Sequence, residues 1–379
     1  MSTLGIALLG SKFMGKAHSN AWAQVGRFFD LPMTPRMEVA AARDAAHLAT
    51  FAARWGWQRW TTNWEEAVSD PEVAVVDVAT PNRLHHDQAL AALEAGKHVA
   101  CEKPLAATLT EAREMAHASA SAPGKTFVWF NYRRVPAVAL AKRLIDEGLL
   151  GRIYHLRAAY LQSWGGSSTA LSWRFSSAEA GSGALGDLGA HAIDLARFLT
   201  GDEFEVVTGA IEARFIDERP LPDEPARTGE STVDDAVVLT ARMSGGAVAT
   251  IEATRLATGY ENANRIEIHG EQGAVRFDFE RMNELGVFDG RDGAKRGWRT
   301  VLTTDPHHPY MAAWWPAGHP LGYEHTFVNQ AADMVAALAG LVPTVPLADF
   351  ADAYQTQRVM EAAVQSARRG SPVTIAEVV

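Results

Sequence analysis

Short apolar runs alternate with longer helical patterns along the first 130 residues, and this alternation restricts the fold more than any other feature. Continuous Val, Ala and Leu runs without polar alternation are typical of parallel strands buried on both faces. The predicted strands cover residues 6–9, 38–42, 73–79, 98–101 and 126–130, and the predicted helices cover residues 14–24, 47–54, 84–95 and 110–119. This order predicts an α/β fold with a doubly wound parallel sheet.

The pattern changes after residue 131. Ser244-Gly245-Gly246 and Gly270-Glu271-Gln272-Gly273 are hairpin signals between strand-like segments. The predicted strands cover residues 153–161, 204–215, 235–243, 247–253, 265–270 and 274–279, and helical patterns cover 138–146, 187–199, 325–338 and 350–367. We therefore predict two domains: residues 1–130 with the parallel sheet, and residues 131–379 as an α+β domain with a large, mostly antiparallel sheet.

The charge balance argues against some binding partners, and the single cysteine bears on the role of its thiol. The chain has 35 basic and 45 acidic residues among 379, which gives a net charge of -10. Nucleic acids and anionic membranes require clustered Lys and Arg, so we expect neither as a partner. Cys101 is the single cysteine, and its place in an apolar run predicts a buried thiol. We find no long apolar segment and no signal-peptide pattern at the start, and we expect a cytoplasmic location.

The segment Gly10-Ser11-Lys12-Phe13-Met14-Gly15 follows the first predicted strand and opens the first predicted helix. This is the context of a Rossmann dinucleotide-binding loop, although Lys12 replaces the middle glycine of the usual pattern. Gly10 would permit the tight turn, and Gly15 would let the helix pack close to the strand. The pyrophosphate would lie at the helix N-terminus, near Lys12, Phe13 and Met14.

The end of the second strand bears on the choice between NAD and NADP. A carboxylate there accepts hydrogen bonds from the ribose hydroxyls and repels a 2′-phosphate. Ala42 occupies the expected acidic position, followed by Arg43 and Asp44. Arg43 without an acidic neighbour favours NADP slightly, while Asp44 could still serve NAD.

Several motifs resemble the signature of the Gfo/Idh/MocA oxidoreductase family, which includes glucose–fructose oxidoreductase and inositol 2-dehydrogenase. They are Thr80-Pro81-Asn82-Arg83-Leu84-His85, Gly96-Lys97-His98-Val99 leading to Glu102-Lys103-Pro104, Asn131-Tyr132-Arg133-Arg134, and the run from Gly186 to Asp194. The resemblance covers nearly the whole chain. It implies a Rossmann domain, then an open-faced sheet domain used for homodimer or homotetramer contacts. It also implies cofactor contacts from Thr80, Pro81, Asn82, His85, Glu102 and Lys103.

Three residues are the predicted catalytic group. Asp187 and His191 are four residues apart on one predicted helix, which places them on the same face. A histidine with an ordinary pKa of about 6.5 can take the proton of a hydroxyl group near neutral pH. We assign His191 as the general base and Asp187 as the residue that positions the substrate hydroxyl. Lys103, at the carboxyl end of a parallel strand, would stabilise the developing alkoxide.

Tyr132, Arg133, Trp173 and Arg174 are predicted to contact the substrate, together with Asp187 and His191. Trp164 could join them as a surface for sugar stacking, and Arg255, His325 and His307-His308 are weaker candidates. The His, Cys, Asp and Glu residues show no metal-ligand spacing, so we expect no metal.

The sequence thus predicts a dehydrogenase that moves a hydride between NAD(P) and a secondary hydroxyl or ketone of a sugar, anhydrosugar or cyclitol. Two alternatives stay open: an enzyme that cleaves glycosides by transient oxidation and elimination, and a nucleotide-binding regulator without catalysis. The substrate, the carbon oxidised and the physiological direction are not encoded in any motif.

Overall fold

The computed structural model describes residues 2–378, which divide into two compact units. Unit 1 combines Met1–Arg134 with Tyr310–Trp315 and Leu321–Tyr354. Unit 2 combines Val135–Pro309 with Pro316–Pro320 and Gln355–Val379. The chain therefore returns to unit 1 after most of unit 2 is complete. No helix among the described residues is both long and apolar enough to span a membrane.

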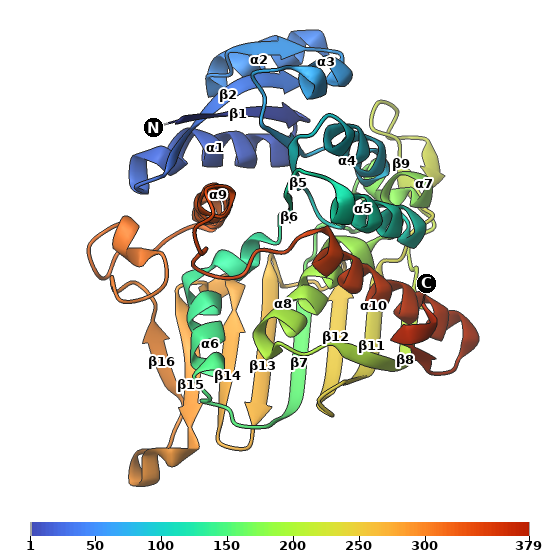
Figure 1. Cartoon of the computed structure of the whole chain (residues 1–379). Helices are drawn as coiled ribbons and strands as arrows, with labels where there is room; N and C mark the ends of the chain where they lie inside the picture. Colours follow the sequence, from blue (N-terminus) through green and yellow to red (C-terminus); the bar gives the residue numbers. More distant parts are fainter. Residues whose placement is uncertain (1, 379) are drawn as a thin grey trace. The chain divides into compact units, whose positions relative to one another are not determined.

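Unit 1 is built on a six-stranded parallel sheet, as the alternating pattern predicts. The strand order is β3-β2-β1-β4-β5-β6, and Figure 1 shows β1, β2, β5 and β6 in blue to green. The strands are β1 (Ser2–Leu9), β2 (Met33–Ala41), β3 (Arg59–Thr61), β4 (Val75–Val78), β5 (His98–Cys101) and β6 (Thr126–Val128). The strand order reverses between β1 and β4, and ligands of such sheets bind at the carboxyl ends of the strands beside this point.

Helices connect and cover these strands. They are α1 (Phe13–Phe28), α2 (Ala45–Trp55), α3 (Trp64–Ser69), α4 (His85–Glu94) and α5 (Leu109–Ser121). A later helix, α9 (Tyr323–Leu338), packs against α1 within the same unit. The three-residue β3 and the six-residue α3 are absent from the sequence prediction, because elements this short carry too little periodicity to be recognised.

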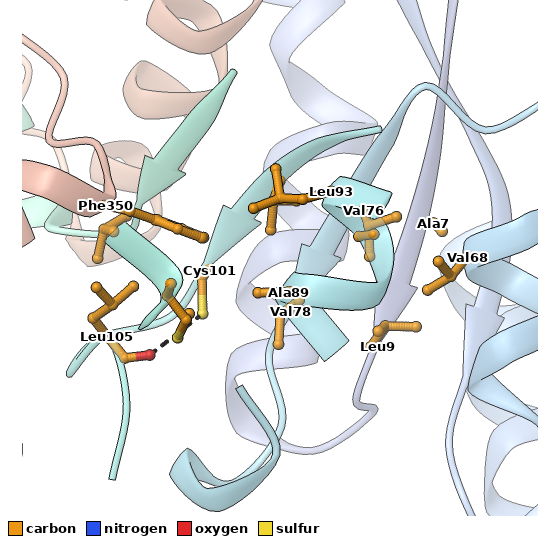
Figure 2. Packing of buried hydrophobic residues seen from close by; sticks show 14 of the residues in the cluster. Ala7, Leu9, Val68, Val76, Val78, Ala89, Leu93, Cys101, Leu105 and Phe350 are labelled. Atoms are coloured by element: carbon orange, nitrogen blue, oxygen red, sulfur yellow. Dashed lines mark hydrogen bonds between the residues drawn. The ribbon is translucent and has the colours of Figure 1, made fainter. Parts of the chain in front are cut away.

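Apolar residues of the parallel strands form one continuous core in unit 1. Val76, Val78 and Cys101 lie in it with Leu105 and Phe350, as Figure 2 shows. The predicted burial of the Cys101 thiol is confirmed, because its exposed fraction is 0%. Burial raises the pKa of this thiol well above its usual range. Cys101 is therefore a packing residue, not a nucleophile.

Unit 2 contains a nine-stranded sheet with the order β16-β15-β14-β13-β7-β12-β11-β8-β17. Only β7 and β12 pair in parallel among its described strands, so the prediction of a mostly antiparallel sheet is confirmed. The strands are β7 (Ile153–Leu161), β8 (Phe204–Ala213), β11 (Ala236–Met243), β12 (Val248–Thr254), β13 (Ala263–Gly270), β14 (Gly273–Asp278), β15 (Glu284–Asp289), β16 (Arg299–Leu302) and β17 (Val373–Thr374). A second, two-stranded sheet pairs β9 (Glu218–Pro220) with β10 (Thr228–Glu230).

Helices cover one face of the nine-stranded sheet. Helix α6 (Pro136–Asp146) packs against β14 and β15, and α8 (Ala190–Thr200) packs against β7, β12 and β13 (Figure 1). Buried and exposed side chains alternate strictly along β11 and β12. This alternation means that the other face of these strands is open. The remaining helices are α7 (Ser177–Ala180) and α10 (Phe350–Arg369), which spans the division between the units.

Candidate active site

The glycine loop of unit 1 turns tightly at the end of β1. Gly10 has a φ of 111°, and a Cβ atom added to it would lie 2.4 Å from the carbonyl oxygen of Ala79. A Cβ atom on Gly15 would lie 2.3 Å from the carbonyl oxygen of Gly10. Both positions therefore require glycine, and the loop touches the segment that follows β4.

The N-terminus of α1 fits an anionic group. The N-cap residue, Lys12, makes no side-chain hydrogen bond to the first turn of the helix. The backbone amides of that turn are therefore not capped by the Lys12 side chain. The side chain of Phe13 is 59% exposed and stacks parallel to Tyr323, with the ring centroids 6.2 Å apart. Met14 is half-buried. A dinucleotide pyrophosphate would be held here by backbone amides and by the positive end of the helix dipole.

The end of β2 carries one exposed cation and a carboxylate with a structural role. Asp44 caps α2, because its Oδ1 atom accepts the amide hydrogen of His47 at 3.0 Å. Arg43 is exposed, and Ala42 brings no charge to the loop. These positions match those expected for the adenosine ribose.

The loops after β4 and β5 are held together by a buried histidine. The ring nitrogens of His85 lie 2.9 Å from the carbonyl oxygen of Thr80 and 3.1 Å from that of Pro104. Burial lowers the pKa of His85, whose exposed fraction is 0%. His85 can therefore act on a cofactor only through the two loops that it joins. Thr80 donates its hydroxyl to Gln88 at 2.7 Å.

Pro81 and Asn82 continue the loop after β4, next to the glycine turn. Asn82 is 8% exposed and begins a short 3-10 helix, while Pro81 is half-buried. The hypothetical Cβ atom of Gly10 lies 3.3 Å from the amide nitrogen of Thr80. Within unit 1 the structure thus brings the predicted cofactor residues of the β1 and β4 loops together.

A cluster of charged side chains lies buried beneath these loops. His18 on α1 contacts Asp77 of β4 through Nδ1 and Glu102 through Nε2, each at 3.0 Å. Trp22 and Trp129 donate their indole N–H groups to Asp77 at 2.7 and 2.9 Å. His18 and Asp77 are both 0% exposed. The two carboxylates raise the pKa of His18 to about 9 against the opposing effect of burial.

Sequence reasoning did not assign His18 and Asp77 to the site. Asp77 stands between valines in a strand predicted to be buried on both faces. A charged residue at such a position requires a buried partner. The charge of Asp77 within an apolar strand is therefore the one sequence signal for this cluster. The partner, 59 residues earlier in the chain, could not be deduced from periodicity.

Lys103 follows this cluster directly. Its backbone amide donates to Oε2 of Glu102 at 3.0 Å, and its side chain is partly exposed at the carboxyl end of β5. The Lys103–Pro104 peptide bond is cis. Lys103 belongs to unit 1, whereas Asp187 and His191 belong to unit 2.

Asp187 and His191 lie on consecutive turns, but the first turn is wider than predicted. Asp187 lies in a π-helical turn, Leu185–Gly189, which continues directly into α8 with His191. The predicted helix from Asp187 to Leu199 is therefore present, but its first turn is π-helical, and π-helical turns are frequent at functional sites. His191 is 6% exposed, and its ring lies 5.8 Å from that of Tyr160 between centroids.

Asp234 holds the start of the π-helical turn. Its carboxylate accepts the amide hydrogens of Gly183 at 2.6 Å and Leu185 at 2.8 Å. A Cβ atom on Gly183 would lie 1.8 Å from the carbonyl oxygen of Asp234. Burial raises the pKa of Asp234 despite these hydrogen bonds. Gly183 is therefore needed for close packing.

Arg255 connects Asp187 to the segment that carries the predicted substrate residues. Its Nη2 atom lies 3.0 Å from Oδ2 of Asp187, and its Nη1 atom donates to the carbonyl oxygen of Arg174 at 3.2 Å. The guanidinium lies 5.1 Å from the ring centroid of Trp164. Arg255, one of the weaker candidates in the sequence, is 1% exposed and contacts Asp187. It fixes the direction of the Asp187 carboxylate.

The predicted aromatic residues lie in the same segment of unit 2. The guanidinium of Arg174 lies 4.5 Å from the ring centroid of Trp173, and both residues are half-buried. Trp164 is 38% exposed and donates its indole N–H group to Gln162 at 2.6 Å. This segment therefore offers aromatic surface in the same unit as Asp187 and His191.

Tyr132 and Arg133 lie in unit 1, in the 3-10 helix Asn131–Arg134 that follows β6. Arg133 pairs with Asp352 at 2.6 Å and is 3% exposed. Tyr132 is 4% exposed. Both side chains are therefore packed within unit 1. The described residues contain no group of three or more His, Cys, Asp or Glu side chains arranged to hold a metal ion.

Family models match two stretches of the chain. Residues 4–130 match the model of an oxidoreductase family with an NAD-binding Rossmann fold, and residues 138–276 match the GFO/IDH/MocA C-terminal domain. Both stretches contain predicted site residues, among them Lys103 in the first and His191 in the second.

Named relatives and solved structures match over the full chain. Levoglucosan dehydrogenase of Pseudarthrobacter phenanthrenivorans is 43% identical over 393 aligned residues, which cover 100% of both chains. The crystal structure of an oxidoreductase domain protein from Kribbella flavida has a TM-score of 0.95 and 47% identity, with 99% of this chain and 100% of that chain covered. A structure of levoglucosan dehydrogenase in complex with NADH and levoglucosan has a TM-score of 0.93 and 43% identity, with 99% and 100% covered.

Proposed function

The chain belongs to the GFO/IDH/MocA oxidoreductase family, and on that premise we propose that it oxidises a secondary ring hydroxyl of an anhydrosugar. The family predicted from the sequence motifs is thereby confirmed, as is an NAD(P)-dependent oxidoreductase that acts on sugars or cyclitols. The observation that carries the narrower substrate class is the 43% identity, over the whole chain, to a relative named levoglucosan dehydrogenase. The motifs Phe13-Met14-Gly15-Lys16-Ala17-His18 and Glu252-Ala253-Thr254-Arg255 also resemble that enzyme.

The glycine loop supports dinucleotide binding. Added Cβ atoms at Gly10 and Gly15 would strike backbone atoms, and Lys12 leaves the first turn of α1 without a side-chain cap. The proposed cofactor residues are Gly10, Lys12, Phe13, Met14, Gly15, Arg43, Thr80, Pro81, Asn82, Glu102 and Lys103, with His85 acting through the two loops that it joins. When bound, the nicotinamide ring accepts the hydride from the substrate carbon.

The proposed chemistry uses three side chains, Lys103, Asp187 and His191. His191 takes the proton of the substrate hydroxyl group. The C–H bond on the carbon that carries this hydroxyl breaks, and its electron pair leaves with the hydrogen as hydride to the nicotinamide ring. The ammonium group of Lys103 stabilises the negative charge that develops on the substrate oxygen. Asp187, directed by Arg255, orients the hydroxyl group. Trp173, Arg174, Tyr132 and Arg133 are the proposed neighbours of the rest of the substrate.

Two observations bear on the choice of dinucleotide and point in opposite directions. Arg43 is exposed at the end of β2, and Asp44 is engaged as the N-cap of α2, which favours NADP. Structures of levoglucosan dehydrogenase have been solved in complex with NADH. We propose that the chain accepts both dinucleotides, because Ala42 brings no carboxylate to repel a 2′-phosphate. The slight preference for NADP stays a prediction.

We further propose that a second copy of the chain covers the open face of the nine-stranded sheet. Ile211 and Val238 are paired across β8 and β11 and are 68% and 45% exposed. The ion pair between Arg157 and Glu267, at 2.7 Å, lies along the same face at a hollow of about 480 Å³. Light scattering would detect a dimer or tetramer, and Val238→Asp should shift it toward monomer. Cytoplasmic location stays a prediction.

Substrate oxidation is tested with a panel of levoglucosan, other anhydrosugars, glucose, xylose, myo-inositol and scyllo-inositol, each with NAD and with NADP. The proposal expects reduced cofactor to accumulate with an anhydrosugar, at the highest kcat/KM in the panel. Lys103→Met should lose most of kcat with the fold intact by circular dichroism. Near-wild-type turnover by that variant would remove Lys103 from the mechanism.

The same assay separates the alternatives. A redox-elimination enzyme would cleave a glycoside without net formation of reduced cofactor, and a regulator would bind dinucleotide without turnover. Relatives named as dehydrogenases and reductases do not favour either hypothesis.

A further inference from the structure

The buried cluster in unit 1 requires a charged histidine. Asp77 accepts two indole N–H groups and one ring nitrogen of His18, an arrangement that suits an ionised carboxylate. Glu102 accepts the backbone amide of Lys103 on Oε2 and faces the other ring nitrogen of His18 with Oε1. Ionised carboxylates only accept hydrogen bonds, so both ring nitrogens of His18 must donate. Only the imidazolium form carries both hydrogens.

We propose that His18 is a positioning residue for the reaction: as an imidazolium bridging Asp77 and Glu102, it sets the backbone at Lys103 through the Glu102 carboxylate. The inference rests on the proposed catalytic role of Lys103.

The contacts form a short path from the core to the lysine. Asp77 lies in the middle of the sheet, on the strand next to β5, and its neighbours hold it from three directions. His18 is held in turn by stacking on Trp129, with the ring centroids 4.2 Å apart. Its Nε2 hydrogen bond fixes one oxygen of Glu102, and the other oxygen receives the amide of Lys103. A rotation of the Glu102 carboxylate would therefore release the amide of Lys103.

The surroundings of the imidazole favour this charge state. Asp77 and Glu102 approach from β4 and from the end of β5, and Trp129 follows β6. From α9, the ring of Phe327 lies 5.6 Å from that of His18 between centroids. The carboxylates raise the pKa of His18 to about 9. Glu102 also acts on the buried Cys101 thiol, whose pKa burial raises, and on His85, whose pKa burial lowers; Lys103 is the adjacent cation.

The test compares His18→Gln with a matched surface variant, His86→Gln. His86 also lies between two carboxylates, at 2.8 Å from Asp87 and 2.9 Å from Glu114, but on the exposed side of α4. Each variant is assayed well below its melting temperature for kcat and KM of the sugar and for the Kd of NADH by fluorescence. Glu102→Gln is the second variant, because it keeps the shape of the side chain should His18→Gln fail to fold.

The inference expects His18→Gln and Glu102→Gln to lower kcat by about 10²-fold, the size that a misplacement of about 1 Å can produce. Folded protein, by circular dichroism, and measurable NADH binding must be retained. His86→Gln should keep wild-type kcat. A His18→Gln enzyme that melts at lower temperature but turns over at the wild-type rate would overturn the inference and leave the proposed function intact. A Lys103→Met enzyme that stays active would instead refute the proposed function.

Discussion

Ionisation of His18 predicts a specific dependence of stability on pH. Its pKa is raised from 6.5 in the unfolded chain to about 9 in the fold by Asp77 and Glu102, and the residue is fully buried. A group whose pKa is raised by folding stabilises the protein fully below its unfolded pKa, and this stabilisation is lost as the pH rises through its folded pKa. The loss therefore falls between about pH 6.5 and about pH 9.

The size of the effect follows from the two pKa values. The difference between 6.5 and about 9 corresponds to roughly 3 kcal/mol, since each pH unit is worth about 1.4 kcal/mol. For a domain of about 150–250 residues, 1 kcal/mol changes the melting temperature by roughly 2–4 °C. The full effect is then about 6–12 °C in the melting temperature of unit 1.

Differential scanning calorimetry of the wild type and His18→Gln across about pH 7 to 9.5 measures this effect. Taking the difference between their melting temperatures removes the pH-dependent contributions of groups common to both proteins, such as His85 and Cys101. It should shrink as the pH rises. A difference that stays constant over this range would mean that the ring of His18 is neutral in the fold. Nitrogen chemical shifts of the labelled imidazole provide the same answer without a variant.

Three further predictions concern Arg43, Arg255 and Gly183. Arg43→Ala should raise the KM for NADP about tenfold and leave that for NAD unchanged, because a charge-assisted hydrogen bond to the 2′-phosphate is lost; steady-state kinetics with both dinucleotides checks this. Arg255→Lys keeps the charge but loses the fork between Asp187 and the Arg174 carbonyl, so kcat should fall at least tenfold while the Kd of NADH is unchanged. Gly183→Ala places a Cβ atom 1.8 Å from a backbone oxygen and should destabilise unit 2 by about 3 kcal/mol, measured by urea unfolding.

The fold could be predicted because its signals are local. Strands buried on both faces read as continuous apolar runs, and residues 6–9 of β1 carry this pattern in four residues. The hairpin after β11 depends on Gly246, whose φ is 89°, so the sequence itself marks the turn. Local signals do not report packing, and the return of α9 to unit 1 beside α1 had no signature along the chain.

The candidate site likewise contains residues that local sequence reveals and residues that it does not. Lys103, Asp187 and His191 stand in motifs that a reader can find, since their neighbours in sequence define them. The groups that orient them come from distant parts of the chain: His18 is 84 residues from Glu102, and Arg255 is 68 residues from Asp187. No periodicity connects such pairs. A single sequence shows only that Asp77 and Arg255 are charged residues inside or beside apolar strands.

That observation suggests a rule for chains of this kind. Burying a carboxylate such as Asp77 without a partner costs several kcal/mol, so a charge within an apolar strand implies a second buried charge elsewhere in the same unit. The partner need not contribute to stability overall, because a well-packed apolar pair can be as stable as a buried ion pair. A buried ion pair beside a catalytic lysine is therefore explained better by orientation than by stability. If Asp77→Leu with His18→Leu folded as stably as the wild type yet lost turnover, orientation would be the reason these two charges are kept.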